Sequence, residues 1–330
     1  GRRQRQMCIR DSLGAVVKHT RDFNLARESV IESGLSIRTP AVDVQRACGT
    51  SIEAAIMIAN KIALGQIESG IAGGTDTVSD APIVYNDDYR RMLLDMHAAR
   101  SATERLKPLL RFRPGFLKPQ LPGVQEPRTG LSMGESTEIT AKEWDVQREH
   151  QDRLAHASHM KAAAAYDEGF YNDLVIPFAD VEEDNNIRRD TTFEKLSSLK
   201  PVFDRSSEGT MTAGNSTPLT DGAAALLLAS EDWARKKNLP ILAYLTFVKV
   251  AAVNFIDDEG LLMAPAYAVS DMLKQANLRL QEFDFYEIHE AFAAQTVATL
   301  KAWLSEKFCR ERLGRNEPMG PIDLSRLNVK

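Results

Sequence analysis

The spacing of apolar residues changes period twice between residues 41 and 77. Residues 41–47 (AVDVQRA) alternate apolar and polar positions, as a half-buried strand does. Residues 51–64 (SIEAAIMIANKIAL) have the period of a helix, and this helix is apolar on most sides. Residues 70–77 (GIAGGTDT) predict a second strand, so the three elements form a βαβ unit with a parallel sheet. One face of the helix holds Ile52, Ala55, Ile56, Ala59, Ile62 and Ala63. The rest is nearly as apolar, with Ala54, Met57 and Ile58, so the helix is predicted to be buried on most sides.

Further elements are expected on both sides of this unit. Residues 23–33 predict a helix that Gly34 ends. Residues 134–168 predict two helices, the second with Asp145 as its N-cap. Residues 209–230 combine a loop rich in glycine, serine and threonine with an apolar strand.

Residues 100–130 differ from the rest of the chain in composition. They contain five of the 14 prolines, and their seven basic residues outnumber two acidic ones. Such a segment makes a poor core element, so we expect it to leave the sheet domain. It is either a solvated face or a surface near an anionic ligand or a partner.

The overall composition excludes several classes of protein. The 330 residues are 43% apolar, enough for the core of one large or two ordinary domains. The net charge is −5 with acids and bases well mixed, which gives no sign of a nucleic-acid partner. Neither a membrane-spanning run nor a secretory signal is recognisable. The odd set of Cys8, Cys48 and Cys309 indicates free thiols in a reducing compartment, so we expect a cytoplasmic enzyme or binding protein.

Cys48 lies at the predicted junction of strand and helix, in the sequence RACGTS. A helix N-terminus favours a thiolate, which is the nucleophilic form of cysteine. The free amides there can also bind negative charge and stabilise an oxyanion on a carbon that the thiolate attacks. A free cysteine at this position can equally be a small buried apolar residue, and position alone leaves both interpretations open.

His289 occupies a second junction of the same kind. Residues 283–306 predict a strand that ends near Ile288 and then an apolar helix, with His289 between them. A zinc protease motif is excluded because Ala293 stands where its second histidine is required. A lone histidine is usually a hydrogen-bonded core residue. Two similar junctions, one with a thiol and one with an imidazole, favour an active site at the carboxyl ends of a parallel sheet.

Other polar motifs point to no further chemistry. His150, His156 and His159 lack an acid or cysteine that would complete a metal site, so we expect surface residues and no bound metal. The loop TAGNSTPLTDG lacks the lysine of a nucleotide-binding P-loop, although its backbone amides could contact a ligand.

Taken together, these motifs resemble the thiolase family, and most of all the thiolase subunits of fatty-acid oxidation complexes. The resemblance runs from about Leu13 to Val329, and the HEAF form at His289 is typical of those subunits, since most other thiolases have asparagine there. It rests on NLARESVIESGLSIRTPAVDVQRACGTSIEAAIMIANKIALGQIESGIAGGTDTVSDAPI, GLSMGESTEITAKEWDVQREHQDRLAHASHMKAA, VEEDNNIRRD, FDRSSEGTMTAGNSTPLTDGAAALLLAS and YEIHEAFAAQTVATL.

The resemblance implies a five-layered α/β/α/β/α fold, built from two similar halves with an inserted loop domain that covers CoA. The implied parts are a foreign or disordered stub at 1–12, an N-terminal half at 13–80 and 206–230, the inserted domain at 81–205, and a truncated C-terminal half at 231–330.

The resemblance also implies roles for individual residues. Cys48 matches the nucleophile that accepts the acyl group, and His289 matches the residue that helps to hold the thioester oxygen. The substrates would be 3-ketoacyl-CoA and CoA, with no metal or redox cofactor. The implied partners are a second copy, as a homodimer or dimer of dimers, and a hydratase/dehydrogenase subunit. Positions lining the CoA and acyl pocket match Met133, Ala213, Ser216, Thr217, Leu219, Ala291 and Phe292.

The sequence departs from the family pattern at both ends. The family's Gly-His-Pro motif and second catalytic cysteine would follow the final residues DLSRLNVK, and Cys309 lies in the wrong context to be that cysteine. The first twelve residues do not resemble the family, so Cys8 is given no role. From this we expect a fragment incomplete at both ends, with little activity alone.

Two other functions fit parts of the pattern. Condensing enzymes of the ketoacyl synthase type share the fold and the cysteine, but they lack the HEAFAAQ context. A non-catalytic lipid-binding homologue is expected to lose the nucleophile, whereas Cys48 is present. Thiolysis of a 3-ketoacyl-CoA through a cysteine acyl-enzyme is therefore the predicted activity.

Overall fold

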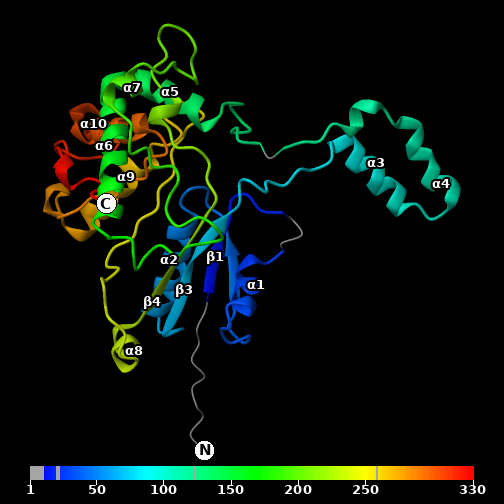
Figure 1. Ribbon diagram of the computed structural model, residues 1–330, viewed down its shortest axis with the longest axis horizontal. Helices are drawn as coiled ribbons and strands as arrows, with labels where there is room; N and C mark the ends of the chain where they lie inside the picture. Colours follow the sequence, from blue (N-terminus) through cyan, green and yellow to red (C-terminus); the bar gives the residue numbers. More distant parts are fainter. Residues whose placement is uncertain (1–10, 20–22, 122, 258) are drawn as a thin grey trace, which may run out of the picture. The chain divides into compact units, whose positions relative to one another are not determined.

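A sheet with the strand order β2-β1-β3-β4 forms the centre of the first of two units into which the chain divides (Figure 1). The first unit comprises residues 1–123 and 219–246, and the second comprises residues 124–218 and 247–330. The computed structural model describes residues 11–19, 23–121, 123–257 and 259–330. The strands are β1 (Asp11–Gly14), β2 (Ala41–Val44), β3 (Ser69–Asp76) and β4 (Gly222–Ala229).

The sheet is mixed. Strand β1 pairs in parallel with both β2 and β3, which confirms the parallel unit expected from the sequence. Strand β4 is the predicted apolar strand after the loop, and it pairs antiparallel to β3 with Ser69 opposite Ala229. Asp11 and Ser12 belong to β1 and are buried, although we expected them in the N-terminal stub. Cys8 and the rest of that stub lie outside the described residues.

Two helices of the first unit follow the sequence pattern closely. Helix α1 begins after Asn24, whose side chain accepts a hydrogen bond from the backbone of Arg27 (2.8 Å). It ends before Gly34, which has a positive φ of 75°. Helix α2 packs against β1 and β3. The helices of this unit are α1 (Leu25–Glu32), α2 (Thr50–Ala63), α3 (Asp87–Ala98), α4 (Ala102–Leu106) and α8 (Glu231–Lys236), with 3-10 turns η1 (Lys107–Arg111) and η2 (Pro114–Leu117).

Less of α2 is buried than the sequence predicted. Ala54 and Ile58 are at most 1% exposed and pack with Ala72 of β3, whereas Ile52 is 68% exposed. The helix is apolar on most sides, so more than one face satisfies the 3.6-residue period. The position of the sheet decides which face is covered.

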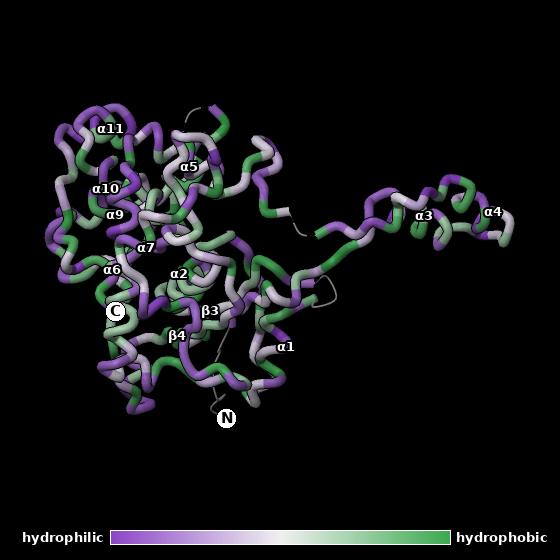
Figure 2. The backbone as a smooth tube through the Cα atoms, turned by 45° about the horizontal axis from the view of Figure 1, so that its top comes forward, coloured by the Kyte–Doolittle hydropathy of each residue, from purple (hydrophilic) through white to green (hydrophobic). Residues whose placement is uncertain are grey.

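The basic, proline-rich segment forms short helices rather than core. Within this segment, helix α4 and the turn η1 pack on each other and on α3, the helix that precedes the segment. Figure 2 shows hydrophilic and hydrophobic residues interspersed along α3 and α4. Large apolar side chains remain exposed there, including Leu110 at 89% and Leu106 at 61%. The segment adds little to the core, but residues 100–123 belong to the same unit as the sheet, so its departure from the sheet domain stays a prediction.

The second unit is helical within the described residues. Its core lies where α10 packs against α5, α6 and α9, and it includes Met211, Leu273 and Trp303. None of the chain's described helices is long and apolar enough to cross a membrane. The helices of this unit are α5 (Met133–Glu143), α6 (Arg148–Asp167), α7 (Phe193–Ser197), α9 (Ala264–Ala276), α10 (Ala293–Leu304) and α11 (Glu306–Glu311), with 3-10 turns η3 (Ala213–Asn215), η4 (Leu280–Glu282) and η5 (Leu324–Arg326).

Two expectations for the second unit are wrong. Asp145 is not an N-cap: its φ of 48° and a hydrogen bond to Lys142 O (3.1 Å) end α5, and α6 begins after Gln147. The expected strand near Ile288 is also missing from the described residues, where a single bridge between Tyr286 and Leu327 takes its place. One bridge is too short a pairing to make a strand.

Two glycines of β3 allow its neighbours to approach closely. A Cβ on Gly74 would lie 2.3 Å from Gly14 O, and one on Gly73 would lie 2.1 Å from Ala224 O. Backbone atoms cannot give way at such distances, so these positions require glycine.

We predict that Gly74→Ala lowers the free energy of unfolding by about 1–3 kcal/mol, because the added methyl group would force β1 and β3 apart. Urea unfolding would measure the change. Gly222→Ala, in β4, is the matched control because the space around Gly222 is open, and it should cost much less. Equal effects of the two substitutions would contradict this account of β3.

Candidate functional site

Cys48 lies in a tight turn between β2 and α2. Its side chain is exposed, and it directly precedes Gly49, the N-cap of α2. The turn is closed by hydrogen bonds from Gly49 N to Arg46 O (2.9 Å) and from Thr50 N to Ala47 O (3.2 Å). Ala47 has a φ of 42°, a left-handed conformation that is uncommon for alanine. Such strain is often found at functional turns.

Thr50 fixes this turn to the sheet. Its hydroxyl donates to Ala47 O (2.7 Å) and accepts from Arg46 N (2.8 Å). A Cβ on Gly14, the last residue of β1, would lie 2.1 Å from Thr50 Cγ2 and 2.4 Å from Val44 O. The turn therefore lies directly at the carboxyl ends of β1 and β2, where the sequence predicted it.

The start of α2 can accept negative charge. Gly49 has no side chain to cap the helix, and the amides of Gly49 and Thr50 already bond within the turn. The amides that follow them in the first turn of α2 are left to other partners. Together with the helix dipole, these amides favour an anion or a developing oxyanion next to Cys48. An exposed thiol beside such a group of donors fits a nucleophile that attacks a carbonyl carbon.

His289, in the second unit, precedes α10. Phe292 is the N-cap of that helix, and the side chain of His289 is exposed. Asn328 bonds to the residues on both sides of the histidine. The Asn328 side chain bonds to the N–H and C=O of Ile288 and to the carboxylate of Glu290.

The structure brings four of the predicted pocket residues together. Thr217 N donates to Ala291 O (2.9 Å), and Ser216 forms an antiparallel bridge with Phe292. The Ser216 hydroxyl is buried and has no hydrogen-bond partner among the described residues. A polar atom in this state is suited to a ligand or a water molecule.

Aromatic contacts connect this pairing to α5. The rings of Phe203 and Phe292 meet edge to face with centroids 5.7 Å apart. Phe203 also lies against Gly134, where a Cβ would be 2.0 Å from its ring. Met133, the preceding residue, begins α5 and is half-buried.

Two predicted pocket residues, Ala213 and Leu219, take no part in this pairing. Ala213 is exposed in the turn η3. Leu219 is 69% exposed and belongs to the first unit, as does Cys48.

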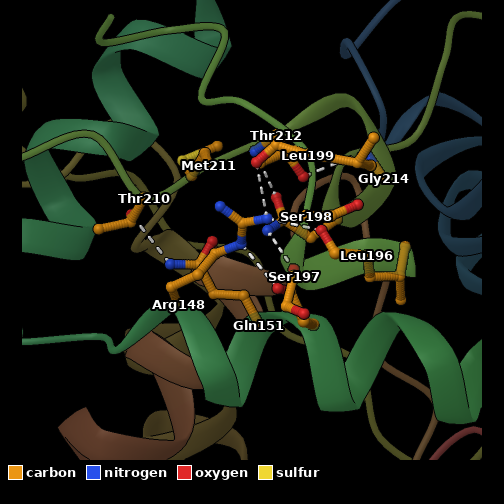
Figure 3. Close-up of polar contacts among 12 residues, drawn as sticks. Arg148, Gln151, Leu196, Ser197, Ser198, Leu199, Thr210, Met211, Thr212 and Gly214 are labelled. Atoms are coloured by element: carbon orange, nitrogen blue, oxygen red, sulfur yellow. Dashed lines mark hydrogen bonds and ion pairs between the residues drawn. The ribbon is translucent and has the colours of Figure 1, made fainter. Parts of the chain in front are cut away.

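A buried polar network shapes the loop of residues 210–217. Asp152 is fully buried, accepts from Arg148 Nε (2.7 Å), and accepts from Asn215 Nδ2 (2.9 Å). Asn215 Oδ1 in turn accepts from Thr212 N (2.8 Å). Figure 3 shows the guanidinium of Arg148 facing the end of α7, where it donates to Leu196 O (2.6 Å).

Two further side chains hold the start of the same loop. The carboxylate of Glu138 accepts from Thr210 N (2.8 Å) and Met211 N (2.9 Å). Gln151 donates to the hydroxyl of Thr210 (3.0 Å), as Figure 3 shows. The loop that carries Ser216 and Thr217 is thus fixed by side chains from α5 and α6.

The three histidines of α6 form no metal site. His150 is exposed, whereas His156 and His159 are half-buried, so these two are only partly at the surface. His159 Nδ1 accepts from Arg188 N (3.3 Å), and burial, followed by repulsion from Arg188, lowers the pKa of His159. No group of three metal-ligating side chains is found in the part of the chain that the structure describes.

Comparisons with known families agree with this geometry. The family model for the thiolase N-terminal domain matches residues 10–232, and the one for the thiolase C-terminal domain matches residues 239–317. The chain belongs to the thiolase family. The α/β fold class and the resemblance found in the sequence are thereby confirmed.

Individual relatives support the same assignment. This thiolase is 44% identical to a 3-ketoacyl-CoA thiolase of Pectobacterium carotovorum, over 96% of its own length and 73% of that protein. It is 43% identical to a 3-ketoacyl-CoA thiolase of Klebsiella pneumoniae, with the same coverage. The crystal structure of human mitochondrial 3-ketoacyl-CoA thiolase in complex with CoA aligns with a TM-score of 0.75 and 27% identity, covering 98% of this chain and 74% of that one.

Several residues of this thiolase site were not expected from the sequence. Asp152 and Arg148 lie on α6, and no role was predicted for either of them. Asn215 lies in the loop TAGNST, whose ligand-binding potential was recognised without a role for this side chain. No local pattern indicated a role for Asn328, because its hydrogen-bond partners are about forty positions away in the sequence. The i,i+4 spacing of Arg148 and Asp152 was the only local clue.

We predict that Asp152→Ala lowers the free energy of unfolding by about 3 kcal/mol, because Arg148 and Asn215 lose the partner that compensates their burial. Chemical denaturation would measure this loss. Glu149→Ala is the control on the same helix, since it breaks an exposed ion pair with Arg153 and should have little effect. A loss no larger than that of the control would show that the network is not needed for stability.

Asp204, the residue after Phe203, leads to a pH-dependent prediction. The hydrogen bond from Lys142 lowers the pKa of the neighbouring Asp204 from 3.8 to about 2. Since the pKa is lower in the folded state, the carboxylate adds to stability above pH 3.8, and this contribution disappears as the pH falls through about 2.

Asp204→Asn should therefore be less stable than the natural chain at neutral pH, and the difference should vanish on acidification. Urea unfolding of both proteins over this pH range tests the expectation. A difference that is independent of pH would mean that the ionised side chain is not the cause.

Proposed function

We propose that this thiolase cleaves 3-ketoacyl-CoA with CoA, giving acetyl-CoA and an acyl-CoA shortened by two carbons. The observation that carries the proposal is the exposed Cys48 thiol at the start of α2, in a chain 44% identical to a 3-ketoacyl-CoA thiolase. The step belongs to the degradation of fatty acids by β-oxidation.

Cys48 is the nucleophile of this reaction. Its thiolate attacks the 3-keto carbon, and the bond between carbons 2 and 3 breaks. The electron pair leaves on acetyl-CoA as an enolate, which then takes up a proton. The acyl group remains on the sulfur as a thioester until the thiolate of free CoA attacks it and restores Cys48. Covalent catalysis divides one difficult step into two easier ones.

His289 helps to hold the thioester oxygen of the substrate. A donor aimed at an oxygen that gains negative charge stabilises the enolate as it forms. Removing one such donor typically costs about 10²–10³-fold in rate, so we expect His289→Ala to slow acylation of Cys48 by about this factor.

The pairing of Ser216 and Thr217 with Ala291 and Phe292 supports a pocket for CoA and the acyl chain in the second unit. The unpartnered hydroxyl of Ser216 supplies a polar contact there, and Phe292 supplies an apolar one. Met133 and Ala213 are the other proposed lining residues of this unit, and Leu219, in the first unit, is proposed as a separate contact of the ligand.

The proposed setting follows from the chemistry. The reaction moves an acyl group and protons, so it needs neither a metal nor a redox cofactor. An exposed nucleophilic thiol is best preserved in a reducing compartment, which supports a cytoplasmic location. A homodimer or dimer of dimers, associated with a hydratase/dehydrogenase subunit that supplies the 3-ketoacyl-CoA, is the proposed assembly.

The test is a single-turnover reaction with 3-ketooctanoyl-CoA in the absence of free CoA, followed by mass spectrometry of the intact chain and its peptides. We expect a hexanoyl adduct on Cys48 and an equal amount of released acetyl-CoA. Cys48→Ala should form no adduct. Cys309→Ala should form it normally, because Cys309 is fully buried.

The outcomes separate the candidate functions. Reversible binding of the substrate without an adduct, in a chain whose Cys48 still reacts with a thiol reagent, would indicate a binding protein. An adduct without release of acetyl-CoA would also contradict thiolysis. The readout is the position of the adduct and the stoichiometry of the products, so it does not depend on a high turnover rate.

A further inference from the structure

Asn328 makes an unusual set of hydrogen bonds. Its Oδ1 accepts from Ile288 N (2.8 Å), and its Nδ2 donates to Ile288 O (2.9 Å). The same Nδ2 donates to the carboxylate of Glu290 (2.6 Å). A side-chain amide has the donor and acceptor of a peptide group, so Asn328 pairs with Ile288 as a neighbouring strand would.

The backbone of Asn328 prepares this pairing. Its φ of 46° is left-handed, a conformation that asparagine tolerates better than most residues. Its N–H donates to Tyr286 O (2.8 Å), while Tyr286 N donates to Arg326 O (2.9 Å). The main chain pairs as far as Tyr286, and the side chain of Asn328 then continues the pairing to the backbone of Ile288.

This segment is itself anchored. Lys161, on α6, donates to Leu327 O (2.6 Å), and the side chain of Leu327 is 2% exposed in the core. Asn328 therefore joins the backbone around His289 to a long helix rather than to a free loop.

His289 depends on this support more than its neighbours do. Its imidazole is exposed and has no hydrogen bond to the residues that the structure describes. The direction of the ring therefore follows from the backbone that carries it. Asn328 holds that backbone at Ile288, on one side of the histidine, and holds the side chain of Glu290 on the other side.

We propose that Asn328 is a positioning residue that aims His289 at the thioester oxygen. The inference rests on the proposed function, because it assigns Asn328 an effect only through His289. A misplacement of about 1 Å at a reacting group can cost about 10²-fold in rate, so loss of the Asn328 side chain should slow acylation by about 10–100-fold.

The test is a double-mutant cycle on the single-turnover acylation of Cys48. Asn328→Gly keeps the left-handed backbone accessible and removes all three side-chain bonds. We expect it to lower the acylation rate constant by about 10–100-fold while changing the KM for 3-ketooctanoyl-CoA by less than about 3-fold. In a His289→Ala background the same substitution should have less than about a 2-fold effect, because its target is gone.

Two further variants separate positioning from stability. Gln281→Ala is the matched control, since Gln281 is another side-chain amide of this unit that donates to backbone carbonyls, those of Met319 (2.9 Å) and Pro321 (2.8 Å). It should leave acylation unchanged. Asn328→Asp keeps the shape but loses both donated bonds and places a carboxylate against Glu290, so it should be as slow as Asn328→Gly, and it replaces that variant if the glycine chain does not fold.

Each result decides between distinct conclusions. Equal losses from Asn328→Gly with and without His289 would show a purely structural role and overturn this inference alone. Unchanged acylation in both Asn328 variants would do the same. Normal acylation in His289→Ala would overturn the proposed role of His289 and the inference with it, whereas absence of any adduct on Cys48 in the natural chain would overturn the proposed function itself.

Discussion

The close approach of three backbone segments at the carboxyl ends of β1 and β2 is the constraint on which the site of the first unit depends. Gly14 leaves room for Thr50 and for the carbonyl of Val44, where any Cβ would lie within 2.4 Å of both. Thr50 then bonds to Arg46 and Ala47 and forces a left-handed alanine into the turn. The cost of that strain, about 1–3 kcal/mol for such residues, is offset by the contacts that impose it. Cys48 is exposed at the start of α2 as a result.

In the second unit, side chains hold the loops that carry the candidate site residues. In the residues that the structure describes, this unit contains isolated bridges but no strand, so backbone pairing fixes its loops only at single points. Side chains hold these loops instead, since Glu138 binds the amides of residues 210 and 211, Asp152 binds Asn215, and Asn328 binds Ile288. Each of these groups offers donors or acceptors with the geometry of a peptide or carboxylate. Removing one side chain leaves the other buried polar groups without a hydrogen-bond partner. The stability of such networks is therefore sensitive to single substitutions.

Much of this organisation could be predicted from the sequence because it is encoded in local periodicity. The βαβ unit, the helix after Asn24 and the junction at Cys48 all follow from apolar spacing and capping residues within a few positions of one another. Predictions failed where local pattern was ambiguous. The apolar helix α2 offered several equivalent faces, and Asp145 resembles an N-cap by residue type although its backbone ends α5 instead. The expected strand at Ile288 needed a partner segment long enough to pair with, which no local signal can supply.

The sequence by itself determined the family, the candidate nucleophile and the strand-to-helix junction at Cys48, because residue type and short-range order carry that information. The tertiary structure alone decided which side chains support them. Ser216 meets Phe292 across more than seventy positions, Asp152 meets Asn215 across sixty-three, and Asn328 reaches Ile288 across forty. Hydrogen bonds over such separations depend on how packed helices bring distant loops together. Periodicity along the chain reports which residues are buried, but it cannot report which of them meet.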